Sequence, residues 1–184
     1  MHVKCVIDMK KIIAILFSCM FYCVINAQKI QDQFFGYGYY TEMNYMERAM
    51  NREGYSHVRE NANKLCAYNV KFGGIDWPFV NFGYHENQLY KVSFSINYND
   101  KHQALSTFKS LKKRLSEKYK GVYNSESLND FQLKDIVYLD EYRGVSLDIE
   151  YAESKGGKKY YYVNLTYVCL RLLEEVEQMN DSDL

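Results

Sequence analysis

The segment KVSFSINYND (residues 91–100) decides the class of the fold. In it Val92, Phe94 and Ile96 alternate with serine and asparagine, which is typical of a strand with one apolar and one polar face. A strand of this kind belongs in an antiparallel sheet that is covered on one side only. The chain also contains 19 tyrosines, a residue that favours half-buried strands.

The residues that follow this strand predict a helix. Asp100 is a good N-cap, and apolar residues then recur at helical spacing: Leu105, Phe108, Leu111, Leu115 and Tyr119. This stripe should face a core. The rest of the helix is basic, with Lys109, Lys112, Lys113, Arg114 and Lys118. Such a strip is either a solvated helix face or a site for an anionic glycan, a lipid headgroup or a protein.

The remaining segments have similar signals. Thr41 is expected to cap a first helix that ends at Gly54 and buries Met43, Met46, Ala49 and Met50. Alternating residues predict strands at 66–72, 80–84, 92–98, 136–142, 145–151 and 161–167, with another starting at 122. A last helix is expected to carry Leu170, Leu173, Val176 and Met179.

This order predicts an α+β fold with two layers, in which helices cover one face of an antiparallel sheet. No Pro/Gly/Ser-rich linker divides residues 28–184, so we expect a single domain. Residues 42–98 and 102–169 are candidate half-repeats, which makes a duplicated αβββ unit a hypothesis. An offset of 71 residues aligns 91–96 with 162–167 and also Gly73 with Gly144.

Residues 1–27 have the pattern of a cleavable secretory signal peptide. Lys10 and Lys11 precede an apolar run, and Ala27 is the small residue that signal peptidase needs. The run, about 14 residues long, is short for a hydrocarbon core of roughly 30 Å, so we expect no membrane span after cleavage. The alternative is a lipoprotein modified on Cys19, against which the bulky Phe17 argues. We expect the mature protein to be periplasmic or secreted.

Composition excludes some functions. The 23 basic residues balance the 23 acidic ones, whereas a general nucleic-acid binder needs excess positive charge. After residue 27 the cysteines are Cys66 and Cys169, too few for a disulfide scaffold. They are either one disulfide or two buried thiols. We favour unpaired thiols because each continues the apolar phase of a strand.

The sequence has no recognisable catalytic or cofactor motif. His57, His85 and His102, the histidines after the signal peptide, lack metal-ligand spacing. The chain contains no Gly-x-Ser-x-Gly elbow, phosphate loop or dinucleotide fingerprint. We therefore predict no catalytic residues, no metal and no cofactor, and we favour binding over catalysis. The alternative is a small extracellular hydrolase whose carboxylates converge only in the folded chain.

The segment IDWPF (residues 75–79) holds the only tryptophan and the only proline. At a turn, Trp77 and Asp76 can stack on and hydrogen-bond a sugar or a partner loop, so we predict both as binding residues for a glycan or a protein. The alternative is a Trp77 folded over the end of the sheet. A second candidate surface is the polar sheet face, represented by Ser93, Ser95, Asn97, Asn164 and Thr166.

Several short motifs resemble an uncharacterised family of small exported proteins from Bacteroidetes. These are FG (35–36), EGY (53–55), VKFGG (70–74), LYKV (89–92), LSEKY (115–119), GVSL (144–147) and the terminal Asp-Leu. The resemblance implies export and supplies no catalytic residues. The repeated order of a helix and strands also resembles the tandem modules of β-lactamase-inhibitor-like proteins, which implies a protein partner by analogy of topology alone.

We predict that signal peptidase cleaves the chain after Ala27, because it is the small residue that follows the apolar run. Mass spectrometry of the protein isolated from its native cells should find Gln28 at the N-terminus. An intact N-terminus at Met9, or a lipid on Cys19, would contradict the assignment.

Overall fold

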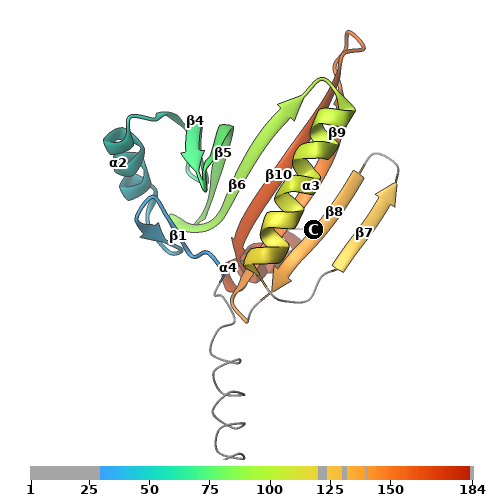
Figure 1. The fold of residues 1–184 in the computed structure, drawn as a ribbon. Helices are drawn as coiled ribbons and strands as arrows, with labels where there is room; N and C mark the ends of the chain where they lie inside the picture. The colour runs from blue at the N-terminus through green and yellow to red at the C-terminus, as the bar shows by residue number, and fades with distance from the viewer. Residues whose placement is uncertain (1–29, 120–123, 130–131, 140, 183–184) are drawn as a thin grey trace, which may run out of the picture.

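The computed structural model describes residues 30–119, 124–129, 132–139 and 141–182. It confirms the predicted α+β fold with two layers (Figure 1). The helices are α2 (Met43–Glu53), α3 (Lys101–Lys118) and α4 (Leu170–Ser182). Figure 1 shows α2 beside one half of the main sheet and α3 across the other half.

Among the described residues, eight strands form one antiparallel sheet in the order β3-β4-β5-β6-β10-β9-β8-β7. Their bounds are β3 (Ser56–Asn61), β4 (Lys64–Phe72), β5 (Ile75–His85), β6 (Gln88–Tyr98), β7 (Asn124–Asn129), β8 (Gln132–Leu139), β9 (Arg143–Glu153) and β10 (Lys159–Cys169). The strands β1 (Gln33–Phe34) and β2 (Tyr37–Gly38) form a separate hairpin. The sheet is therefore two four-stranded meanders joined where β6 pairs with β10.

Each half of the fold is a helix followed by four strands, so the repeated unit is αββββ and not αβββ. In the first half the strand that the sequence does not reveal is β3, with the sequence SHVREN. This edge strand is exposed along most of its length, and even its one aliphatic residue, Val58, is 51% exposed. An exposed edge strand needs no apolar alternation, which is why the sequence pattern misses it.

The predicted offset of 71 residues describes the centre of the sheet and fails elsewhere. It places Phe94 on Leu165, and these two residues lie directly opposite each other in the β6–β10 pair. A pseudo-two-fold axis therefore passes between them. The alignment of Gly73 with Gly144 is wrong, because Gly73 lies in the turn after β4 whereas Gly144 lies inside β9. The two halves have hairpins of different length, which breaks the constant offset.

One hydrophobic core lies between the helices and the sheet. The predicted faces of α2 and α3 are confirmed, with Met43, Met46, Ala49 and Met50 buried from α2 and Phe108, Leu111 and Leu115 buried from α3. Phe94 is at the centre of the core. Its ring stacks on that of Phe72 with centroids 4.6 Å apart and lies 5.2 Å from that of Trp77.

In strands β4 and β5 the alternation of side chains between the two faces of the sheet reverses at the position where Asn69 lies opposite Pro78. The register runs from Tyr68–Phe79 to Val70–Trp77, and Asn69 has a φ of 54°. Proline has no N–H to give to the ladder, and a left-handed residue re-aims the chain. Val70 and Trp77 consequently enter the core. The prediction that the alternating residues of 66–72 share one face is therefore wrong. Cys66 and Tyr68 lie on the face of the sheet opposite to that of Val70.

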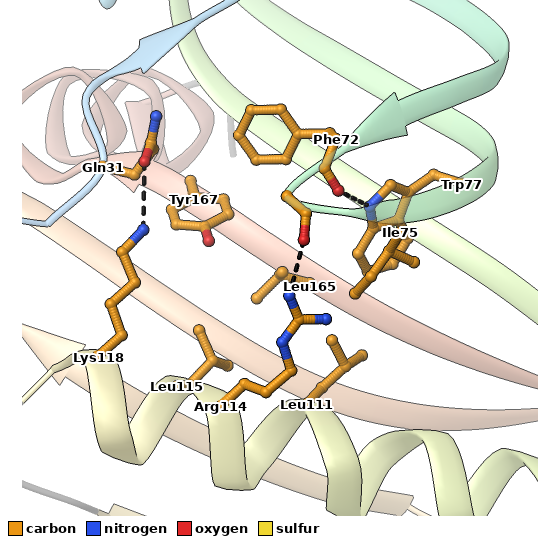
Figure 2. Close-up of a pocket in the computed structure, with 11 residues that line it drawn as sticks. Gln31, Phe72, Ile75, Trp77, Leu111, Arg114, Leu115, Lys118, Leu165 and Tyr167 are labelled. Atoms are coloured by element: carbon orange, nitrogen blue, oxygen red, sulfur yellow. Dashed lines mark hydrogen bonds between the residues drawn. The ribbon is translucent and has the colours of Figure 1, made fainter.

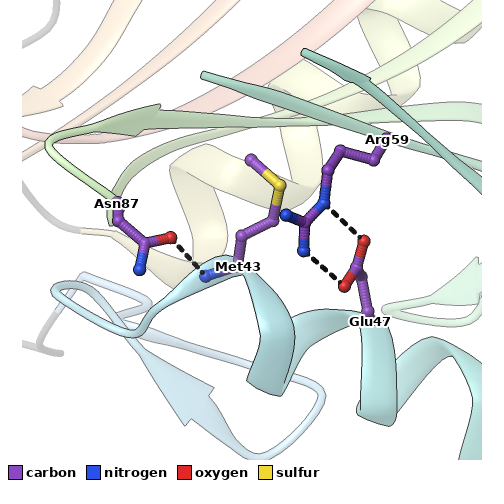
Figure 3. A network of polar contacts seen from close by, with 4 residues as sticks. All are labelled: Met43, Glu47, Arg59 and Asn87. Carbon is purple, nitrogen blue, oxygen red and sulfur yellow. Dashed lines mark hydrogen bonds and ion pairs between the residues drawn. The ribbon is translucent and has the colours of Figure 1, made fainter. Parts of the chain in front are cut away.

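Helix α2 is capped through a tertiary contact. The structure places Glu42 at the N-cap with no side-chain cap bond, so the predicted cap by Thr41 is wrong. The N–H of Met43 instead donates to Oδ1 of Asn87 in the β5–β6 turn, at 3.3 Å (Figure 3). Met43 and Asn87 are 44 residues apart in the sequence, so the local pattern around the helix gives no sign of this bond. The predicted end at Gly54 is confirmed, with a φ of 75°.

A bidentate ion pair holds α2 against β3. Arg59 donates from Nε and Nη2 to the two carboxylate oxygens of Glu47, at 2.8 and 2.6 Å (Figure 3). This hydrogen bonding to Arg59 lowers the pKa of the Glu47 carboxyl. The pair therefore links the helix to an edge strand that buries little apolar surface.

Helix α4 follows β10 directly and differs from its predicted register. Leu172 is the buried residue, whereas Met179 is 51% exposed. Within the part of the chain that the structure describes, no helix combines the length and apolar character needed to cross a bilayer.

The face change at Asn69 leads to a stability prediction. Asn69→Val should lower the free energy of unfolding by about 1–2 kcal/mol, because a β-branched residue is poorly tolerated in the left-handed region. Asn69→Gly should have little effect. Asn97→Val, the same exchange at an exposed position of β6, is the matched control and should change stability by less than about 0.5 kcal/mol. Urea denaturation measures all three, and equal effects of the two valine variants would contradict the account.

Candidate functional site

The structure separates the two residues predicted to bind a partner. Trp77 lies in β5, is 1% exposed, and donates from Nε1 to the carbonyl oxygen of Phe72 at 3.1 Å. The neighbouring Asp76 has a side chain that is 82% exposed and lies 3.6 Å from Nζ of Lys71. Adjacent strand residues point to opposite faces, so the two side chains do not share a surface. Their role in binding stays a prediction, and the folded-in tryptophan is the arrangement observed.

The polar face of the sheet carries an ordered network across three central strands. The hydroxyls of Ser93 (β6) and Thr166 (β10) are hydrogen-bonded at 3.0 Å. Ser95 donates to Oδ1 of Asn164 at 2.7 Å, and the Nδ2 of Asn164 donates to Oδ1 of Asp148 on β9 at 2.8 Å. The structure thus brings together four of the five residues predicted for this face.

These residues form the floor of a groove. Its central cavity has a volume of about 390 Å³ and is lined by Asn81, Lys91, Ser93, Ser95, Asp148, Glu150, Tyr162, Asn164 and Thr166. A second cavity of about 440 Å³ adjoins it and shares Asn81, Lys91 and Ser93. We call the two together the polar groove. The central floor side chains are short, whereas Lys91 and Tyr162 are long, and this difference in size produces the hollow.

Gly83 shapes the outer end of the polar groove. A Cβ added there would lie 3.3 Å from an atom of the Tyr90 ring and 3.2 Å from the Cβ of Lys91. Glycine therefore lets the Tyr90 ring lie against the backbone of β5, where both residues line the second cavity. The register of β5 and β6 shifts immediately after Gly83, which is typical of a strand position that bends to build a site.

The two carboxylates that line the polar groove come from one strand. Asp148 and Glu150 both come from β9 and lie two residues apart on the same face. Glycoside hydrolysis normally needs two carboxyl groups that flank the scissile bond from opposite sides. The described residues contain no group of three or more side chains placed to hold a metal ion. What the groove offers is hydrogen bonding by hydroxyls and amides.

Cys66 supports the polar groove from the side. Its thiol sulfur lies 3.0 Å from both Oδ1 of Asn81 and Oε1 of Glu60. Burial, aided by the hydrogen bond to Glu60, raises the pKa of this thiol to about 12. Cys66 and Cys169 are both free and buried, which confirms the prediction of unpaired thiols. A thiol with so high a pKa is a poor nucleophile.

A separate cleft lies on the helix face of the sheet, between α3 and the β4–β5 turn (Figure 2). Trp77 lines this cleft from β5, and Arg114 and Lys118 line it from α3. The predicted residue Trp77 thus borders a cavity, although not the exposed surface expected for it.

The sequence pattern does not predict how the residues of the polar groove come together. Asn81, Asp148 and Tyr162 occupy the polar phases of their strands, and that pattern could have identified each of them singly. Their assembly depends on the strand order β5-β6-β10-β9, in which β6 pairs with a strand that begins far along the chain. Local alternation does not specify such a pairing.

Comparison finds no matching family model, no matching curated protein and no matching solved structure. The resemblance to exported Bacteroidetes proteins and the analogy with tandem inhibitor modules therefore stay predictions.

The environment of Cys66 predicts its reactivity. An ordinary cysteine titrates near 9, so the raised pKa of about 12 keeps the folded thiol neutral at pH 8 and slow to alkylate. Its contribution to stability should be full below about pH 9 and be lost as the pH rises towards 12. Iodoacetamide labelling followed by mass spectrometry should leave Cys66 unmodified in the folded protein. Unfolding without a reductant should release both thiols for labelling, and failure to recover them would reveal a disulfide.

Proposed function

We propose that this protein is an exported, non-catalytic binding protein that holds a neutral glycan in the polar groove. The observation that carries the proposal is the network from Ser95 through Asn164 to Asp148, which holds a hydroxyl and an amide in place on an open sheet face.

The chemistry of the groove floor matches that of sugar hydroxyls. Hydroxyl and amide side chains both donate and accept hydrogen bonds, as each hydroxyl of a sugar does. Ser93, Ser95 and Thr166 provide hydroxyls, and Asn81 and Asn164 provide amides. Because their neighbours already hold them in place, little side-chain entropy is lost when a ligand binds. The floor is therefore arranged in advance for a polyhydroxylated ligand.

Two tyrosines give the groove partly apolar sides. Tyr162 lines the central cavity and Tyr90 lines the adjoining one, and both are partly exposed. A tyrosine ring presents an apolar face to the C–H side of a sugar and keeps a hydroxyl for hydrogen bonding. The combination of hydrogen-bonding floor and aromatic sides favours a glycan.

The same residues argue against a protein as the main occupant. Protein interfaces depend on large buried anchors such as tryptophan and arginine, which fill pockets on the partner. The floor of the groove instead carries serine, threonine and asparagine. The few charges along it, from Lys91, Asp148 and Glu150, have mixed signs, so a neutral ligand suits the groove better than an anionic one.

Export supports this assignment. The signal-peptide pattern of residues 10–27 is the basis for placing the mature protein in the periplasm or outside the cell. A protein in either place meets the polysaccharides of the cell envelope and its surroundings.

Calorimetry with neutral and acidic oligosaccharides tests the proposal. A neutral oligosaccharide should bind, and Asn164→Ala should weaken it at least about tenfold, or 1.4 kcal/mol, because the variant removes the middle of the network. Ser95→Ala should weaken binding in the same direction. Asn99→Ala and Ser110→Ala, exposed residues outside the polar groove, are the matched controls and should leave the affinity unchanged.

Unchanged affinity in Asn164→Ala and Ser95→Ala, with binding intact in the controls, would exclude the polar groove as the site. Chromatography of the oligosaccharide after long incubation separates binding from hydrolysis. The proposal expects the oligosaccharide to remain whole, and shortened products would favour the hydrolase alternative.

A further inference from the structure

The cleft between α3 and the β4–β5 turn has mainly apolar walls (Figure 2). Leu111 and Leu115 line it from α3, Leu165 lines it from β10, and Ile75 and Trp77 line it from β5. Its volume is about 300 Å³, at the lower end of the range for small-molecule pockets. An apolar group of modest size would gain free energy by leaving water for this space.

Two cationic side chains stand over the apolar walls. Arg114 and Lys118 lie one turn apart on α3, each three residues after one of the leucines, Leu111 and Leu115. Figure 2 shows both side chains reaching from the helix across the cleft towards its opposite wall. Two positive charges beside a low-dielectric cavity attract an anion to its mouth.

The present partners of these cations are neutral. Arg114 donates from Nη2 to the carbonyl oxygen of Gly73 at 2.7 Å, and Lys118 donates from Nζ to Oε1 of Gln31 at 3.3 Å. Among the ion pairs of the described residues, none involves either cation. A carboxylate would replace these bonds with charge-assisted ones, which are roughly twice as strong. Gly73 is exposed and Gln31 partly exposed, so water can satisfy the released oxygens.

We infer that this cleft is a second binding site, for an apolar carboxylate of medium chain length. The apolar tail lies against Leu111, Leu115 and Trp77, and the carboxylate lies between Arg114 and Lys118. The site is on the opposite face of the sheet from the polar groove, so it does not depend on the proposed glycan.

Trp77 supplies a direct probe of this site, because it is the only tryptophan of the chain and lines the cleft. Bromine quenches tryptophan fluorescence on contact. Titration of the mature protein with 10-bromodecanoate should quench the emission in a saturable manner. The neutral 10-bromodecanol should bind at least about tenfold more weakly, since it lacks the charge that the two cations recognise.

Variants on one helix locate the carboxylate. Arg114→Gln and Lys118→Gln should each weaken 10-bromodecanoate at least about tenfold and leave the weak binding of 10-bromodecanol unchanged. Lys109→Gln removes an equal charge from an exposed position of α3 outside the cleft, so it should bind like the unaltered protein. Circular dichroism confirms that each variant is folded.

Equal affinity for the acid and the alcohol would overturn the proposal, and that comparison requires no variant. Equal losses in Lys109→Gln and Arg114→Gln would also overturn it, because they would indicate a general charge effect. Asn164→Ala should bind 10-bromodecanoate normally, so the cleft and the polar groove can fail independently.

Discussion

The pairing of β6 with β10 is the interaction on which the rest of the structure depends. It joins the two four-stranded meanders, and Phe94 and Leu165 face each other at its centre. On one face of this pair Phe94 organises the aromatic core, with the rings of Phe72 and Trp77 around it. On the other face the neighbouring residues hydrogen-bond across the same two strands, Ser95 to Asn164 and Ser93 to Thr166. Core and groove are thus two sides of one strand pair.

The two halves repeat a topology, and the residues that shape the two proposed binding sites lie where the halves differ. Helix α3 is longer than α2 and extends across the central strands, where its basic residues reach the cleft. The first half has the face change at Asn69 and Pro78, which turns Trp77 into the core and makes it a wall of that cleft. Gly83, where Tyr90 packs on the backbone, likewise shapes the polar groove from the first half. These departures from the repeat shape both proposed sites.

Local patterns predict the elements that bury a continuous face, such as β6 and the stripe from Phe108 to Leu115 on α3. They fail where the chain departs from regular geometry or leaves the core. The left-handed Asn69 reverses the alternation of buried and exposed residues in β4, and the exposed β3 has no apolar alternation. The polar residues of the groove are visible singly as alternating positions, but the contact between Ser95 and Asn164 joins residues 69 apart. Such contacts follow from strand order, which alternation does not encode.

We propose the polar face built by β6 and β10 as the ligand-binding surface of the protein. The most direct measurement is an NMR titration of the labelled protein with a neutral oligosaccharide, following the side-chain amide signals of Asn81 and Asn164 and the indole signal of Trp77. If the ligand binds there, both amide signals shift together and saturate at one affinity, while the buried indole signal stays in place. Unmoved amides beside a shifting indole would show that the ligand occupies the helix face, and would contradict the claim.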